Sequence, residues 1–246
     1  PNFMKVLNNF RVQHKCIGCG LHSESFFCNL PEPDLQIFES LKITNAYPKG
    51  TVLFIEGQPA GGIYMLCQGR VKLSTCSRDG KVIILRIAEA GEVLGLSATV
   101  SDSVYEATAE VLESCQVNFV RKGDFLRFLQ ENVNACLSAV KKLSSEYHTT
   151  FTQVRSLGLS ASIADRLAKL FLEWCKTNGA NNGDSVHLKI SYTHEEIAEM
   201  IGTSRETVTR ILKDFKNKNL INLKGSDLII PDKKRLEATI GTRQKH

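Results

Sequence analysis

Between residues 47 and 120 the apolar positions come in short β-type runs, separated by turns in which glycine recurs. Asp79-Gly80 lies between two of these runs and is a strong hairpin signal. Many short strands with evenly spaced turns predict a small antiparallel barrel or roll. We expect its strands at 51–55, 63–66, 71–75, 82–87 and 105–111, after a short helix around residues 35–41.

A long helical pattern follows from about residue 124 to residue 157. Its seam positions recur at alternating steps of four and three, at Val133, Leu137, Val140, Ser144, Tyr147, Phe151 and Val154. This spacing is that of a coiled coil and predicts a parallel homodimer. The alternative is that the stripe packs on its own domain.

Residues 193–212 have the pattern of two short helices joined by a tight turn. Thr193 and Glu196 have the spacing of a capping box, Gly202 permits a sharp turn, and Ser204 can cap the second helix. The outer side of that helix carries polar side chains at Arg205, Glu206, Thr209 and Arg210. Arginine suits the acceptors of guanine, and a carboxylate can accept from the amino group of cytosine. We therefore expect DNA contact here, the alternative being an ordinary helical hairpin with a solvated charged face.

The segments around this helix pair predict a winged helix-turn-helix. Gly158 is expected to act as a hinge, and Ser160 to begin another amphipathic helix. Near the end of the chain, the runs 220–223 and 228–230 flank the turn sequence Lys224-Gly225-Ser226-Asp227, which is a hairpin signal. We expect Lys224 in this wing to meet a phosphate, which positions the protein without specifying sequence.

Length and charge fit a two-part organisation of α+β class. The 246 residues have room for two modest domains, and the excess of Lys and Arg lies mainly in residues 159–246. We expect a Cys-rich leader at 1–30, a β-roll sensor domain at 31–123, a dimerisation helix at 124–158 and a DNA-binding domain at 159–246. No apolar run is long enough for a bilayer and no secretory leader is visible, so we expect a cytoplasmic protein without a membrane partner. Its eight cysteines are then expected to be reduced thiols, suited to a metal, a cluster or redox sensing.

An N-terminal roll, a long helix and a winged helix-turn-helix resemble, in that order, the CRP/FNR family of bacterial transcription regulators. The resemblance covers about residues 30–232, and its most specific segment is 201–212. It implies that Arg205, Glu206 and Arg210 contact bases of a palindromic TGTGA-type site. It also implies double-stranded DNA, a second copy of the chain and RNA polymerase as partners.

The roll departs from the cyclic-nucleotide-binding members that it resembles. Those members carry a Gly-Glu-Leu motif and an Arg-Ser pair that holds the cyclic phosphate. Here Leu96 stands where the Glu would be, and Tyr105 and Glu106 stand about where the Arg and Ser would be. A phosphate would lack its arginine and meet a carboxylate instead, which argues against cyclic AMP as a ligand.

The cysteines resemble those of the oxygen-sensing branch of the family. In that branch three leader cysteines and one from the roll hold a [4Fe-4S] cluster, which implies Cys16, Cys19, Cys28 and Cys115 as ligands here. The spacing differs, because eight residues separate Cys19 from Cys28 against five in that branch. Zinc with His14 or His22, reversible thiol oxidation, and thiols that only pack remain open alternatives. The other four cysteines are expected to be packing residues, at Cys67, Cys76, Cys136 and Cys175.

Three classes of function are thus compared. The main prediction is a dimeric regulator whose N-terminal half sets its DNA affinity. A regulator without an effector, or with a small-molecule effector and no metal, is the second class. A cupin-like enzyme is disfavoured, because such barrels need inward histidines and residues 47–120 contain none.

Overall fold

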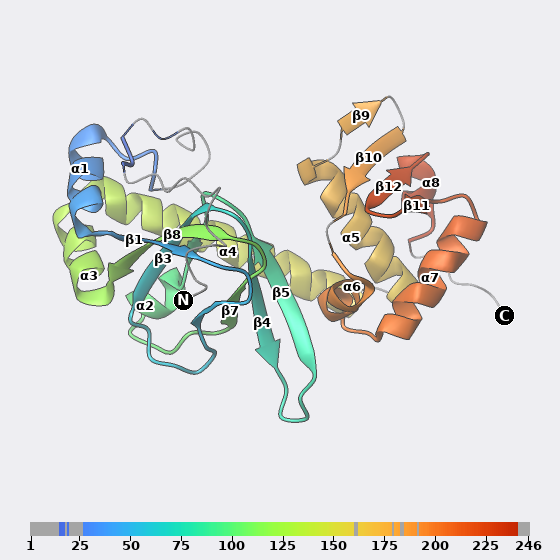
Figure 1. The fold of residues 1–246 in the computed structure, drawn as a ribbon, viewed down its shortest axis with the longest axis horizontal. Helices are drawn as coiled ribbons and strands as arrows, with labels where there is room; N and C mark the ends of the chain where they lie inside the picture. Colours follow the sequence, from blue (N-terminus) through green and yellow to red (C-terminus); the bar gives the residue numbers. More distant parts are fainter. Residues whose placement is uncertain are drawn as a thin grey trace, which may run out of the picture. The chain divides into compact units, whose positions relative to one another are not determined.

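A computed structural model of the chain describes residues 15–17, 19, 27–159, 162–178, 180–182, 185–190 and 192–240. The chain divides into two compact units, Pro1–Thr149 and Thr150–His246. The predicted α+β class is confirmed: an N-terminal unit built on antiparallel sheets, helices, and a C-terminal helix-turn-helix (Figure 1).

The N-terminal unit is a roll of two antiparallel four-stranded sheets, with strand orders β1-β8-β3-β6 and β2-β7-β4-β5. The predicted Asp79-Gly80 turn joins the long hairpin of β4 and β5. Strands at 43–47 and 93–94 and a short helix at 96–100 were not expected from the sequence. The strands are β1 Ile43–Tyr47, β2 Val52–Phe54, β3 Gly62–Gln68, β4 Val71–Cys76, β5 Val82–Ala88, β6 Val93–Leu94, β7 Thr108–Val111 and β8 Cys115–Arg121.

The sheet that contains β3 and β8 has a different hydrophobic core on each face. Between the two sheets lies the roll interior, which includes Leu66, Cys115 and Val117. On the outer face lies a second core that includes Met65 and Val120, covered by helices and by described parts of the leader. The alternation of side chains along a strand produces this division, since successive residues point to opposite faces.

Helices cover the outer face of this sheet (Figure 1). They are α1 Glu32–Leu41, α3 Lys122–Glu131 and the start of α4 Val133–Leu159, while α2 Leu96–Val100 follows β6. The single helix expected over 124–157 is divided at Asn132, whose backbone is extended at φ −127° and ψ 101°. The Asn132 side chain donates to the Phe128 carbonyl at 2.9 Å, which gives a carbonyl near the C-terminal end of α3 a local hydrogen-bond donor. The predicted seam begins directly after this break.

The C-terminal unit packs helices against one antiparallel sheet of order β11-β12-β10-β9. Its core contains Leu167, Phe171, Val208, Leu228 and Leu236. The elements are α5 Ile163–Asn178, β9 Ala180–Asn182, β10 Ser185–Lys189, α6 His194–Ile201, α7 Arg205–Asn217, β11 Asn222–Lys224, β12 Asp227–Ile230 and α8 Lys233–Ala238.

Some local expectations were wrong. Gly158 is not a break, because α4 continues to Leu159. Ser160 lies outside the described residues, and the residue that caps the start of α5 is Ser162, whose Oγ accepts from the Asp165 N–H at 3.1 Å. Two cysteines expected to pack, Cys76 and Cys136, are exposed.

Candidate nucleic-acid interface

The helix pair α6–α7 is built by local capping and a small apolar contact. The Thr193 side chain accepts from the Glu196 N–H at 3.2 Å, and the Glu196 carboxylate accepts from the Thr193 N–H at 2.7 Å. This is the predicted capping box. Gly202 ends α6 with φ +68°, and Ser204 then caps α7 through the Thr207 N–H at 3.3 Å. The turn therefore has the geometry that the sequence required.

The two helices bury one side each and leave one side of α7 open. One core contains Ile197 and Ala198 from α6 together with Val208 and Leu212 from α7. Ala198 is almost fully buried, at 1% exposure, as expected for a small residue at a close helix contact. A shallow depression on the outer side of α7 is lined by Arg205, Glu206, Thr209, Arg210 and Lys213. The structure thus brings four of the predicted base-reading residues onto one surface.

Two further residues, His194 beside this surface and Lys213 on it, were missed from the sequence. His194 Nδ1 lies 3.0 Å from the Thr209 hydroxyl, and that hydroxyl donates to the Arg205 carbonyl at 2.9 Å. This contact orients Thr209 between α6 and α7. Lys213 lies one turn beyond Thr209, a spacing of four that could have identified it.

Glu206 is held as an anion at the start of α7. Its own backbone N–H, the Ser204 side chain and the Arg205 charge together lower the pKa of the Glu206 carboxyl. A carboxylate at a helix N-terminus is also favoured by the helix dipole. Glu206 can therefore accept hydrogen bonds but not donate them.

The predicted wing is the β11–β12 hairpin. Lys224 pairs in register with Asp227, and Gly225 in the turn has φ +59°. Lys224 is exposed at the edge of this hairpin, where a phosphate contact is sterically open.

Comparisons with known proteins agree with this architecture. A cyclic nucleotide-binding domain matches residues 44–132, and a Crp-like helix-turn-helix domain matches residues 165–239. A global nitrogen regulator of Synechococcus elongatus is 31% identical over 182 residues, which cover 71% of this chain and 79% of that protein. The chain belongs to the CRP/FNR family.

Other members of the CRP/FNR family are similar over most of the chain. The CRP-like cAMP-activated global transcriptional regulator of Mycobacterium tuberculosis is 24% identical over 190 residues, covering 77% of this chain and 84% of that protein. The structure of FixK2 from Bradyrhizobium japonicum has a TM-score of 0.69 at 20% identity, covering 80% of this chain and 96% of that one. These relatives are regulators, so the chain is a DNA-binding transcription regulator and not an enzyme.

CRP/FNR regulators bind DNA and function as dimers, and the α4 seam has the surface that a dimer needs. Its apolar side chains are exposed in the single chain, from 52% for Leu137 to 73% for Val133. The opposite side of α4 is buried on the roll through Ala135 and Ala139. No described helix is long and apolar enough to cross a membrane.

Tyr105 stands about where the family resemblance would place a phosphate-binding Arg. This side chain is 4% exposed and stacks on Phe54, with ring centroids 4.1 Å apart. Its hydroxyl donates to the Gly62 carbonyl at 2.8 Å and lies 3.1 Å from the Gly61 nitrogen. The neighbouring Glu106 is exposed. Tyr105 is therefore a core residue of the roll and offers no positive charge to a phosphate.

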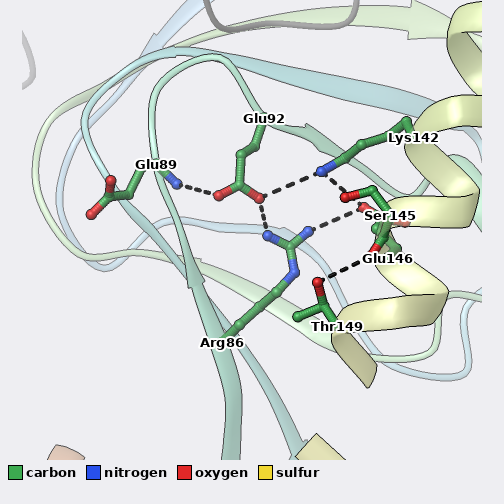
Figure 2. Close-up of polar contacts among 7 residues, drawn as sticks. All are labelled: Arg86, Glu89, Glu92, Lys142, Ser145, Glu146 and Thr149. Carbon is green, nitrogen blue, oxygen red and sulfur yellow. Dashed lines mark hydrogen bonds and ion pairs between the residues drawn. The ribbon is translucent and has the colours of Figure 1, made fainter. Parts of the chain in front are cut away.

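A cluster of four charges joins the roll to α4 (Figure 2). Arg86 on β5 pairs with Glu92, and its other nitrogen lies 3.4 Å from a Glu146 oxygen on α4. Lys142, only 8% exposed, lies 3.3 Å from Glu146 and 3.9 Å from Glu92. The Glu89 N–H holds the other Glu92 oxygen at 3.2 Å. Two cations and two carboxylates thus compensate one another between the loop before β6 and α4.

The substitution Arg86→Met should weaken this connection. Glu92 and Glu146 would then share only Lys142, and we expect the free energy of unfolding to fall by about 1 kcal/mol, the upper end for a partly exposed ion pair. Urea unfolding of the unmodified protein and of Arg86→Met at low and high salt measures this change. The difference in the free energy of unfolding between the two proteins should be larger at low salt. Arg78→Met, in the exposed β4–β5 turn, is the matched control. Equal unfolding midpoints for the two variants would contradict a stabilising cluster.

The ligand set implied by the oxygen-sensing branch is not brought together. Cys115 lies in the roll interior, where its Sγ is 3.1 Å from the Glu113 carbonyl and 3.4 Å from the Arg70 carbonyl. Cys16 and Cys28 belong instead to the core on the outer face of the sheet. The structure does not bring Cys115 together with the described leader thiols, because its strand position points to the opposite face. The histidines at 14 and 22 lie outside the described residues. Among the residues that the structure describes, no three His, Cys, Asp or Glu side chains are arranged to hold a metal ion.

Proposed function

We propose that this regulator reads a palindromic TGTGA-type operator as a homodimer. The observation that carries this is the outer face of α7, where Arg205, Glu206 and Arg210 lie together and open to solvent. Arginine can bond the guanine edge in a bidentate manner, and ionised Glu206 can accept from cytosine. Thr193, Ser204, Thr209 and Lys224 support these contacts by capping, by orientation and at the phosphates.

The exposed α4 seam supports the dimeric part of the proposal. Apolar side chains that follow one helix at coiled-coil spacing and are more than half exposed are typical of a surface that a second helix covers. A two-fold dimer presents two copies of α7, which suit two half-sites about 34 Å apart.

The N-terminal unit is proposed to set DNA affinity without a cyclic nucleotide. Buried Tyr105 and exposed Glu106 leave the phosphate of such a ligand without a cationic partner. The charge cluster of Arg86, Glu92, Lys142 and Glu146 gives the roll a direct contact with the dimerisation helix. Contact with RNA polymerase and a cytoplasmic location follow as expectations from the family.

Fluorescence anisotropy with labelled duplexes tests the operator. We expect a palindrome with two TGTGA half-sites to bind at least about 1,000-fold tighter than a scrambled duplex at the same salt concentration. A duplex with one intact half-site should lose most of this preference. Equal affinity for the palindrome and the scrambled duplex, in both reduced anaerobic and oxidised samples, would contradict the proposed reading. A constitutive regulator would instead bind the palindrome equally in both samples.

A further inference from the structure

The hydroxyl of Thr209, on the outer face of α7, is held by two groups of the protein. It donates its single proton to the Arg205 carbonyl, one turn earlier, at 2.9 Å. His194 Nδ1 on α6 lies 3.0 Å from the same oxygen. Because the Thr209 proton is already used, the proton of this second hydrogen bond must come from His194 Nδ1. The contact therefore fixes the histidine tautomer as well as the orientation of the threonine.

His194 is itself fixed by the core beneath it. Its side chain is half-buried at the first position of α6. The ring lines a small depression together with Ile197, Leu212 and Leu223, one apolar residue each from α6, α7 and β11. Packing on these side chains and the hydrogen bond at Nδ1 hold the ring from two directions, which suits His194 to a positioning role.

This arrangement leaves the methyl group of Thr209 as the part of the side chain that can approach a base freely. Thr209 is exposed, and it lines the depression on the outer side of α7 with Arg205 and Arg210. Its oxygen is occupied by α6 and by the backbone, so the hydroxyl has no proton to donate to DNA. Thymine carries a C5 methyl group in the major groove, and apolar contact with a threonine methyl is one of the ways in which proteins read it.

We propose that His194 and Thr209 form a thymine-selecting pair. His194 holds the Thr209 hydroxyl toward the protein, and the Thr209 methyl contacts the C5 methyl of one thymine in each half-site. His194 acts only through Thr209 and is a positioning residue. The pair rests on the proposed function in one respect, that α7 reads bases in the major groove, and it does not require the TGTGA sequence.

Replacing single thymines by deoxyuridine tests the pair, because this change removes the C5 methyl and nothing else. The duplex is the palindrome that the unmodified full-length chain enriches from a random library. We expect deoxyuridine at one position of each half-site to weaken binding by about fourfold, the scale of one buried methyl group. Thr209→Ser, which keeps the hydroxyl, should lose this penalty, and Thr209→Val, which keeps a methyl, should retain it.

The outcomes separate this proposal from that of the operator. A penalty kept by Thr209→Ser and lost by Thr209→Val would show that the hydroxyl reads the base and would overturn the pair. The absence of any deoxyuridine penalty that depends on residue 209 would also overturn it. An enriched palindrome other than TGTGA would contradict the proposed operator and leave the test of the pair intact, whereas a library without enrichment would contradict both.

Variants of His194 test the positioning role. His194→Ala removes the donor, and His194→Asn restores an N–H close to the place of Nδ1. We expect the deoxyuridine penalty to shrink at least about twofold in His194→Ala and to return in His194→Asn, while His187→Ala, at an exposed histidine on β10, keeps it. The ratio between the two duplexes is the readout, because a uniform loss of phosphate contacts cancels in it. A penalty unchanged in His194→Ala would overturn the role of His194.

Nitrogen NMR of isotope-labelled histidine gives a measurement without DNA. At about pH 8, above the usual pKa of histidine, the neutral His194 ring should carry its proton on Nδ1. Thr209→Val should abolish this preference, since the oxygen that accepts the proton is then gone. A proton on Nε2 in the unmodified protein would make Nδ1 an acceptor, and would overturn the assignment of His194 as the donor.

Discussion

Replacing Arg205 by Ala should remove most of the preference of the regulator for one base pair in each half-site. Arg205 is exposed at the first position of α7 and contributes nothing to the buried core of the unit. A bidentate arginine–guanine contact accounts for about 1–3 kcal/mol of discrimination against the wrong base. The variant should therefore fold normally and bind DNA, but with relaxed selectivity at that position.

The measurement is a set of operator duplexes that differ at one base pair, titrated at fixed salt. Lys234→Ala on α8 removes the same charge from an exposed position of the same unit and serves as the control. It should weaken binding to all duplexes by the same factor. If Arg205→Ala also weakened all duplexes by one common factor, Arg205 would be a phosphate contact and not a base contact.

The substitution Val140→Glu places a charge in the seam and should have the second large effect, on the oligomeric state and on operator affinity. Val140 is 56% exposed in the single chain. The substitution should therefore change the free energy of unfolding of the protomer by no more than about 0.5 kcal/mol. In a dimer, however, two carboxylates would be buried against each other without partners, which is strongly unfavourable. We expect a monomer, and an operator affinity reduced by about 1,000-fold or more because only one half-site is then read.

Sedimentation velocity gives the oligomeric state, and anisotropy gives the affinity. Ser145→Glu introduces the same side chain at an exposed position of α4 that the helical repeat turns away from the seam, and should remain dimeric. A dimeric Val140→Glu with normal affinity would show that a different surface forms the dimer.

Features fixed by local chemistry could be predicted from the sequence. The capping box of Thr193 and Glu196, the left-handed turn at Gly202 and the Asp79-Gly80 hairpin each depend on residues within a few positions of one another. The seam and the outer face of α7 follow from the helical period alone. These features also carry the family resemblance, which the comparisons confirm.

Features that depend on contacts between distant segments could not be predicted in this way. The break at Asn132 is local, since its side chain bonds Phe128 only four residues earlier, but an asparagine alone does not show that it will end a helix within a continuous apolar pattern. Which cysteines share a core depends on which face of a central strand each one occupies. Cys67 lies in the bulge between Leu66 and Gln68, and such an irregularity cannot be recognised in the sequence. The contact of His194 with Thr209 likewise requires the two helices to be packed first.

The sheet that contains β3 and β8 also acts as a partition. Its inner face lines a roll interior filled by Tyr105 and other apolar side chains. Its outer face packs against the described leader residues, such as Phe27 and Cys28, and against the buried side of α4. The described leader residues and the buried side of α4 therefore share one core, which is separate from the roll interior. A change of packing in that outer core would be transmitted to α4 while the roll interior stays filled, because the two cores lie on opposite faces of one sheet.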